Sequence, residues 1–303
     1  MRASLLARRP VPVVLVGALA IAFSGILYRL SHVSPSTGAF YRCVWALPPL
    51  WLLARYEGRR FGRRNVRARR LAWLAGLFFA ADLVLWHNAI EQVGAGLGTV
   101  LGNTQVVLVG ILTWVIIGER PARESLLAIP VVGVGVVLIS GALEQGAYGS
   151  NPPLGAFFGV LTGIAYAGFL IALRVGSRDG RPAGPLFDAT LASAVGCAVL
   201  GVALGDLDAT PSLAATAWLI ALALSSQVVG WLLIAIALPR LPAALSSVML
   251  TFQPVCSVIF AALLVHEQPS ALQLFGAACI VGGLVVATLG RRREGIPEPE
   301  LAG

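Results

Sequence analysis

Long apolar stretches separated by short polar segments run along the whole chain. Stretches of spanning length fall at residues 11–30, 38–54, 71–90, 94–117, 124–141, 154–174, 184–204, 213–238, 241–265 and 271–289. A transmembrane helix needs about 20 mostly apolar residues, because it must cross roughly 30 Å of hydrocarbon. The pattern therefore predicts an all-α integral membrane protein with ten transmembrane helices.

The composition agrees with a membrane location and excludes several chemistries. Of the 303 residues, 57% are hydrophobic and 12% are charged, whereas a soluble domain is about 25% charged. All 22 basic residues are arginine. Without lysine the chain cannot form a retinal or pyridoxal Schiff base, nor a phosphate-binding P-loop. We expect no cofactor. The energy for any work that the protein does must then come from a gradient, a difference in substrate concentration or a partner.

The arginines indicate how the chain is oriented. Twenty of the 22 fall in segments that the ten-helix pattern places on one side of the membrane, and eight of these lie between Arg55 and Arg70. Basic residues in short loops stay in the cytoplasm, so residues 1–10 and 290–303 are predicted to be cytoplasmic tails of a cell (inner) membrane protein. The net charge of +8 then reflects contact with anionic headgroups of the lipid bilayer and not a nucleic-acid partner.

The sequence contains an internal duplication. A shift of 148 positions aligns Gln105 with Gln253, Glu119 with Glu267 and Pro121 with Pro269 without a gap. The repeat units are residues 11–141 and 154–289, with five predicted helices each. Because five is odd, the second copy crosses the membrane in the opposite sense, as in many secondary transporters. Two such halves have two arrangements of similar energy, which alternating access requires.

Short motifs in both halves add a family resemblance. Gln253-Pro254-Val255 is followed by Leu263 to Gln268, and the first half has Gln105-Val106-Val107 followed by Gly118-Glu119-Arg120-Pro121. These segments, with Arg42 in the second span, resemble the drug/metabolite transporter superfamily, in particular its EamA-type branch. The resemblance covers about residues 12–290. It implies ten helices in two inverted five-helix repeats and the movement of small metabolites, often amino acids.

Two charged residues within the spans are the main candidates for substrate binding. Charge is costly inside a membrane, so such residues are functional candidates by default. Asp82 lies near the middle of the third span and is predicted to bind a substrate amine or carry a proton. Its alternative is a carboxylate neutralised by a neighbouring helix. Arg42 is predicted to clamp a substrate carboxylate, and its alternatives are snorkelling to the outer surface or a structural pair with Asp82.

Further polar residues complete the predicted site. Gln105 and Gln253 occupy equivalent positions in the two repeats, where they either bind a polar ligand or join helices by hydrogen bonds. His87 and Glu91 share one helix face and could form a proton path towards Asp82. The histidines are scattered and make no metal site.

Aromatic residues and helix ends have predicted structural roles. Trp45, Trp86, Trp231 and Tyr166 are expected to form aromatic walls for a partly apolar substrate. Glu119, Glu267 and Pro254 are expected to cap helices or act in gating.

The sequence favours a secondary transporter of a small polar metabolite such as an amino acid, exporting it, with proton coupling left open. We expect no enzymatic activity. Two alternatives stay open: a membrane enzyme acting on a lipid or isoprenoid substrate, and a passive channel or non-transporting scaffold. The predicted partners are the small-molecule substrate and the lipid bilayer, and assembly as a homodimer is left open.

Overall fold

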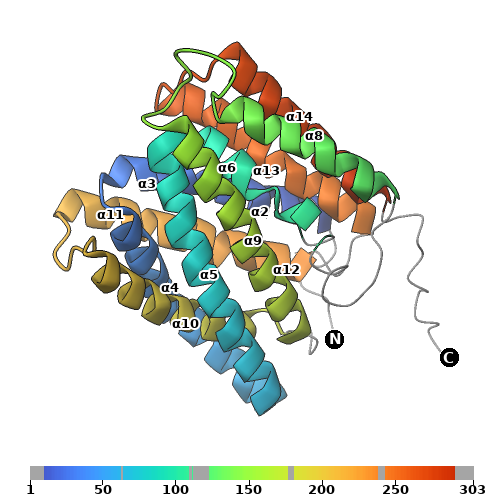
Figure 1. Ribbon diagram of the computed structural model, residues 1–303. Helices are drawn as coiled ribbons and strands as arrows, with labels where there is room; N and C mark the ends of the chain where they lie inside the picture. Colours follow the sequence, from blue (N-terminus) through green and yellow to red (C-terminus); the bar gives the residue numbers. More distant parts are fainter. Residues whose placement is uncertain are drawn as a thin grey trace.

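The computed structural model describes residues 10–62, 64–108, 111, 123–176, 181–237 and 243–290 (Figure 1). These residues form helices joined by short turns, and no strand occurs in these ranges, which confirms the all-α prediction. The elements are α2 (Pro10–Ala22), α3 (Ser24–Ser31), α4 (Pro35–Phe61), α5 (Val66–Val93), α6 (Ala95–Gly102), α8 (Arg123–Ile139), α9 (Pro152–Gly176), α10 (Ala183–Leu204), α11 (Leu213–Leu222), the π-helix η1 (Ala223–Gly230), α12 (Trp231–Ala237), α13 (Ala243–Leu264) and α14 (Ala271–Gly290).

Several of these helices can cross a membrane. In the described residues, five helical segments are long and apolar enough to span it: Pro10–Ser31, Val66–Val93, Pro152–Leu173, Ala183–Leu204 and Leu213–Ala237. Three shorter apolar helices cover Leu126–Ile139, Thr251–Leu264 and Ala271–Ala287. Large apolar side chains such as Val199 and Leu213 are exposed on the outside of the bundle. This is the surface that lipid tails would cover.

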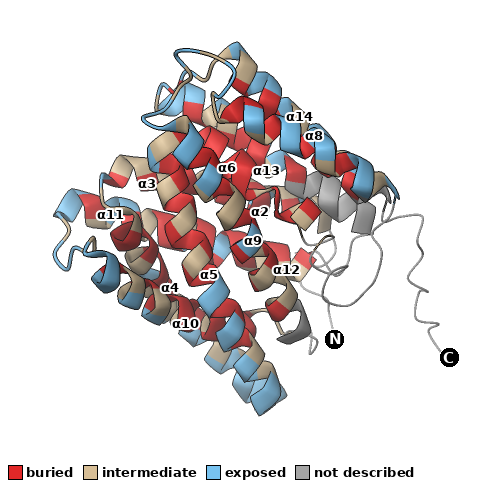
Figure 2. Cartoon of the chain, in the orientation of Figure 1, coloured by how far each residue is buried: buried red, intermediate tan, exposed pale blue. Residues whose placement is uncertain are grey.

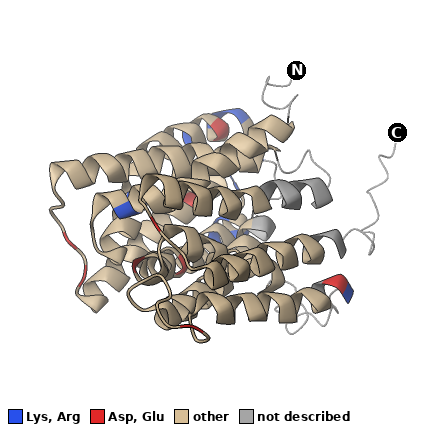
Figure 3. Cartoon of the chain, turned by 90° about the horizontal axis from the view of Figure 1, so that it is seen from above, with Lys and Arg blue, Asp and Glu red and all other residues tan. Residues whose placement is uncertain are grey.

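Burial and charge both distinguish the inside of the bundle from its outer faces. Figure 2 shows buried residues gathered where the helices face one another, with exposed residues on the outer faces and at the helix ends. Figure 3 shows that most of the helical surface in that view is neither acidic nor basic. The few charges inside the bundle therefore need a specific explanation.

The duplication is visible in where two of the helices begin. Helix α4 begins at Pro35 and α10 at Ala183, which is 148 positions further along the chain. The halves interlock, since α10 packs along α4, α14 along α8 and α9 along α5. The two repeats are therefore packed against each other along these helices.

Segments at opposite ends of α5 form two polar clusters. Before the start of α5, the side chain of Arg64 pairs with Asp188 of α10 at 2.6 Å. After its end, Arg29 of α3 lies 3.8 Å from Glu267. A helix of 28 residues is about 42 Å long, so the two clusters are separated by roughly the thickness of a bilayer.

Candidate functional site

A small cavity in the middle of the bundle is lined by several buried polar side chains, among them Arg42 and Asp82. Its volume is about 50 Å³. It is lined by Ile21, Ser24, Arg42, Phe79, Asp82, Leu83, Trp86, Thr99, Gly102, Asn103, Thr162, Tyr166, Trp231 and Gln253. This volume suffices for one or two water molecules but is far below the ~300 Å³ of the smaller ligand pockets. The cavity as it stands is therefore too small for a metabolite.

Arg42 enters the cavity from α4 and is 3% exposed. Its Nε donates to Oε1 of Gln227 at 3.2 Å, and its Nη2 donates to Oγ of Ser226 at 3.1 Å. The guanidinium carbon lies 5.6 Å from the ring centre of Trp86 and 6.0 Å from that of Phe79. Two neutral hydrogen-bond acceptors and two aromatic faces thus stabilise the buried cation.

Asp82 reaches the same cavity from α5 and is 6% exposed. Its carboxylate makes neither a hydrogen bond nor an ion pair with another described residue, so it is not paired with Arg42. A buried carboxylate without partners is costly, and a ligand, a proton or water would stabilise it. This is the arrangement expected of a group that acts in binding.

Two further polar atoms point to a ligand. The indole Nε1 of Trp231 and the hydroxyl of Thr162 are buried and have no hydrogen-bond partner among the described residues. Both residues line the cavity. The ring of Trp231 is held edge-on against Phe169, with ring centres 5.3 Å apart, and against Tyr166 at 6.1 Å. Aromatic packing therefore holds the indole in place, leaving its N–H available to an acceptor in the cavity.

The cavity contains six of the residues predicted for substrate binding. Arg42, Asp82, Gln253, Trp86, Trp231 and Tyr166 all line it. Trp45 does not, because it is 36% exposed on the outside of the bundle. The buried face of α4 follows Ala39, Cys43 and Ala46, and Trp45 points away from it. The expectation for Trp45 is therefore not met.

Gln105 is also absent from the cavity wall, although it is buried. Its backbone lies against Gly163 of α9, where an added methyl group would come within 3.2 Å of the Gln105 nitrogen. Of the two duplicated glutamines, Gln253 lines the cavity and Gln105 does not. Asn103, two residues before Gln105, lines the cavity instead.

His87 is completely buried next to the cavity, between α4 and α3. Its Nδ1 lies 3.0 Å from the carbonyl oxygen of Pro35, and its ring stacks on Tyr28 with centres 3.9 Å apart. Because the carbonyl can only accept, Nδ1 carries the hydrogen. Nε2 has no hydrogen-bond partner among the described residues. Glu91 is exposed at the end of α5, so the two groups occupy different environments, and the path predicted between them stays a prediction.

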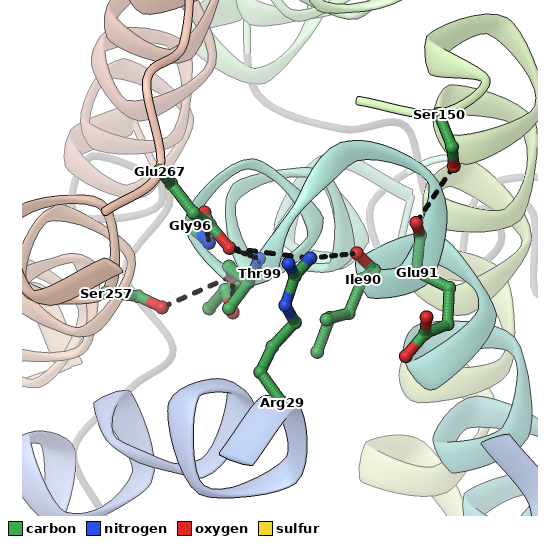
Figure 4. A network of polar contacts seen from close by, with 9 residues as sticks. Arg29, Ile90, Glu91, Gly96, Thr99, Ser150, Ser257 and Glu267 are labelled. Carbon is green, nitrogen blue, oxygen red and sulfur yellow. Dashed lines mark hydrogen bonds and ion pairs between the residues drawn. The ribbon is translucent and has the colours of Figure 1, made fainter. Parts of the chain in front are cut away.

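Glu267 lies outside the spanning segments, at the turn after α13, and connects three parts of the chain (Figure 4). It is 2% exposed. Its carboxylate accepts hydrogen bonds from the backbone N–H groups of Ala95 at 2.6 Å and Gly96 at 3.1 Å, the first residues of α6. Arg29 is the nearby cation and also donates to the carbonyl oxygen of Ile90. Burial raises the pKa of Glu267, while the two N–H groups and Arg29 oppose that rise.

Pro254 and Glu119 are the remaining residues with a predicted structural role. Pro254 lies within α13 and is buried. A proline cannot donate the helical hydrogen bond, so it weakens the helix just after Gln253. Glu119 lies outside the described residues.

Sequence reasoning missed the residues that hold Arg42. Ser226 and Gln227 lie in η1, and the Gln227 amide donates onward to the hydroxyl of Thr190 at 3.1 Å. All three are fully buried. Short polar side chains in an apolar run also occur at ordinary helix contacts, so they carry little signal on their own. The 148-residue shift was the available clue, because it aligns Thr190 with Arg42.

An all-helical bundle with apolar outer faces and charged residues around a central cavity defines an integral membrane protein with a polar cavity among its helices. The model of the EamA-like transporter family matches residues 9–141 and again residues 153–289. The chain therefore belongs to the EamA-like transporter family. It is a multi-pass membrane protein with two copies of the family's repeat, and members of this family transport small molecules.

Comparison with solved structures supports the fold. Among them, 26 chains match significantly. One, described only as "Crystal structure of protein", aligns with a TM-score of 0.62 at 17% identity, covering 94% of this chain and 99% of that chain. At this identity the likeness shows the fold alone. No curated protein matches significantly.

Proposed function

We propose that the protein is a secondary transporter that exports a small polar metabolite of the amino acid type by alternating access. The observation that carries this proposal is the central cavity, where a buried guanidinium and a buried carboxyl group, those of Arg42 and Asp82, lie without a hydrogen bond between them. A dipolar substrate has a carboxylate for the first and an ammonium group for the second. The unpartnered N–H of Trp231 supplies a further donor.

The proposal includes a topology. Ten helices cross the cytoplasmic membrane as two inverted repeats, residues 11–141 and 154–289, with both tails in the cytoplasm. The distribution of arginine supports this orientation. The ion pair between Arg64 and Asp188 also supports it, since it joins segments that the topology places on the same side.

The small size of the cavity fits one step of alternating access. A site of about 50 Å³ holds water and no metabolite, so the helices must separate for a substrate to bind. Asp82 is the group that we propose binds the substrate ammonium or a coupling proton. Gln253, Trp86 and Tyr166 then surround the rest of the molecule.

Flux into liposomes that contain only this protein tests the proposal. The purified protein is first screened by thermal shift against amino acids, because a ligand stabilises the state that it binds. Uptake of the best radiolabelled ligand should saturate with concentration and fall at least tenfold in Asp82→Asn and Arg42→Gln. Flux that never saturates would indicate a channel. No flux for any stabilising ligand, or chemical conversion of it, would overturn the proposal.

A further inference from the structure

The way in which Arg42 is held has a consequence for the charges in the cavity. A guanidinium and a carboxylate that line one small cavity normally form an ion pair. Here the Nε and Nη2 atoms of Arg42 are already occupied by Gln227 and Ser226, at 3.2 Å and 3.1 Å. Neither partner carries a charge, so the cation is oriented without being neutralised.

The amide of Gln227 can adopt only one orientation. Arginine has donors and no acceptor, so the oxygen of the amide must face Arg42. The nitrogen then donates to the hydroxyl of Thr190 at 3.1 Å. The amide is thus fixed at both ends, by α4 on one side and α10 on the other, and it is completely buried.

The π-helical turn explains how two consecutive residues reach one side chain. In an α-helix, neighbouring side chains point about 100° apart. Residues Ala223–Gly230 form a π-helix instead, in which the turn is wider, and such turns are frequent at functional sites. Ser226 and Gln227 here both face Arg42. A return of this segment to α-helical geometry would withdraw at least one of the two acceptors.

We propose that Gln227, assisted by Ser226, is a positioning residue that holds the Arg42 guanidinium away from Asp82 and so keeps both charges available to the two ends of a dipolar substrate. This inference rests on the proposed function for its biological meaning. Arg42 from α4 is the charged group that acts on Asp82, and Asp82 in turn acts on Tyr166 from α9 and Cys197 from α10. Arg42 is the only cation among them. The position of the Arg42 guanidinium therefore decides whether it pairs with Asp82.

The test measures whether the Nε–H resonance of Arg42 depends on the Asp82 carboxyl group, and it needs no substrate. The full chain is labelled with ¹⁵N-arginine and reconstituted in liposomes, and the Nε–H resonance of Arg42 is identified by its loss in Arg42→Lys. In the wild type, Asp82→Asn should leave this resonance almost unchanged. In Gln227→Leu, Arg42 loses the Nε acceptor and turns to Asp82, so the resonance should move, and Asp82→Asn in that background should largely reverse the movement.

A second substitution separates positioning from a general structural effect. Gln227→Glu retains an acceptor for Nε, so the resonance should move but stay insensitive to Asp82→Asn. Ser193→Ala is the matched control, because it removes a buried hydrogen bond of α10 to Gly76 that does not involve Arg42, and it should change nothing. If Gln227→Leu does not fold, Ser226→Ala, which frees Nη2, should show the same dependence on Asp82 as Gln227→Leu.

Two results would overturn the inference. One is a wild-type resonance that already depends on Asp82. The other is a folded Gln227→Leu or Ser226→Ala protein in which Asp82→Asn has no effect. Absence of transport would contradict the proposed function but would leave these resonances and their meaning unchanged, so the two failures can be told apart.

Discussion

Glu57 and Asp206 cap each other's helices at the two ends of the α4 and α10 pair. The carboxylate of Glu57, in the last turns of α4, accepts hydrogen bonds from the N–H groups of Ala183 and Gly184 at 3.0 Å and 2.8 Å, where α10 begins. Asp206, just beyond the end of α10, accepts from the N–H of Ser36 at 3.2 Å, near the start of α4. The helix pair thus has one capping carboxylate at each end.

These caps predict how the helix pair responds to loss of either carboxylate. Glu57→Gln and Asp206→Asn each keep the size of the side chain but remove the charge that favours a helix N-terminus. Each should lower the free energy of unfolding by about 1 kcal/mol, seen as a lower melting temperature in detergent. Arg59→Gln, at an exposed position of α4, is the control and should change little. Equal effects of all three substitutions would show that the caps contribute no specific stability.

The sequence predicted the global plan better than the contacts of the site. Hydrophobic runs predicted the all-helical fold and the 148-residue shift predicted the two repeats, because both depend on patterns that extend over many residues. Asp82 and Arg42 were found because charge is rare in spans. Trp45 was misplaced because its orientation depends on which face of α4 meets its neighbours. Gln227 was missed because the π-turn that directs it towards Arg42 arises from packing and leaves no periodic signal.

The indole N–H of Trp231 is predicted to be a substrate donor. Trp231→Phe keeps an aromatic ring but removes the N–H that has no partner among the described residues. Because an unsatisfied buried donor costs about 1–3 kcal/mol, the ligand-free variant should be as stable as the wild type or more stable. The melting-temperature increase caused by the best ligand of the screen should fall strongly. A variant that melts much lower without ligand would show instead that the N–H is needed for the fold.

Two glycines of α4 are predicted to respond in opposite ways to alanine. At Gly38 a methyl group would lie 2.7 Å from the ring carbons Cδ2 and Cε2 of Tyr28 and 3.2 Å from Nδ1 of His87. Since both rings are fully buried, Gly38→Ala should cost about 1–3 kcal/mol through overpacking.

At Gly58 nothing lies within 4 Å of the added methyl group. Gly58→Ala should therefore stabilise the helix by roughly 0.5–1 kcal/mol. Melting temperatures of the two variants, measured side by side in one detergent, check the difference. Similar values for both would mean that Gly38 does not allow close packing of Tyr28 on α4.

The buried carboxylate of Glu267 predicts a specific dependence of stability on pH. Burial raises its pKa above the ordinary 4.5, against the opposing N–H groups of Ala95 and Gly96 and the charge of Arg29. A carboxyl group with a raised pKa binds its proton more tightly in the folded state than in the unfolded state. Its contribution is therefore complete below about pH 4.5 and is lost as the pH rises through the folded-state pKa.

Glu267→Gln cannot titrate, so it isolates this contribution. The stability of the wild type relative to Glu267→Gln should fall as the pH is raised from about 4.5 towards neutrality, by about 1.4 kcal/mol for each unit by which the pKa is raised. If the stability of the wild type relative to Glu267→Gln instead grows as the pH rises, the hydrogen bonds to α6 and the charge of Arg29 outweigh the effect of burial on Glu267. In that case the ionised form of Glu267 would be the one that holds the start of α6 against the turn after α13.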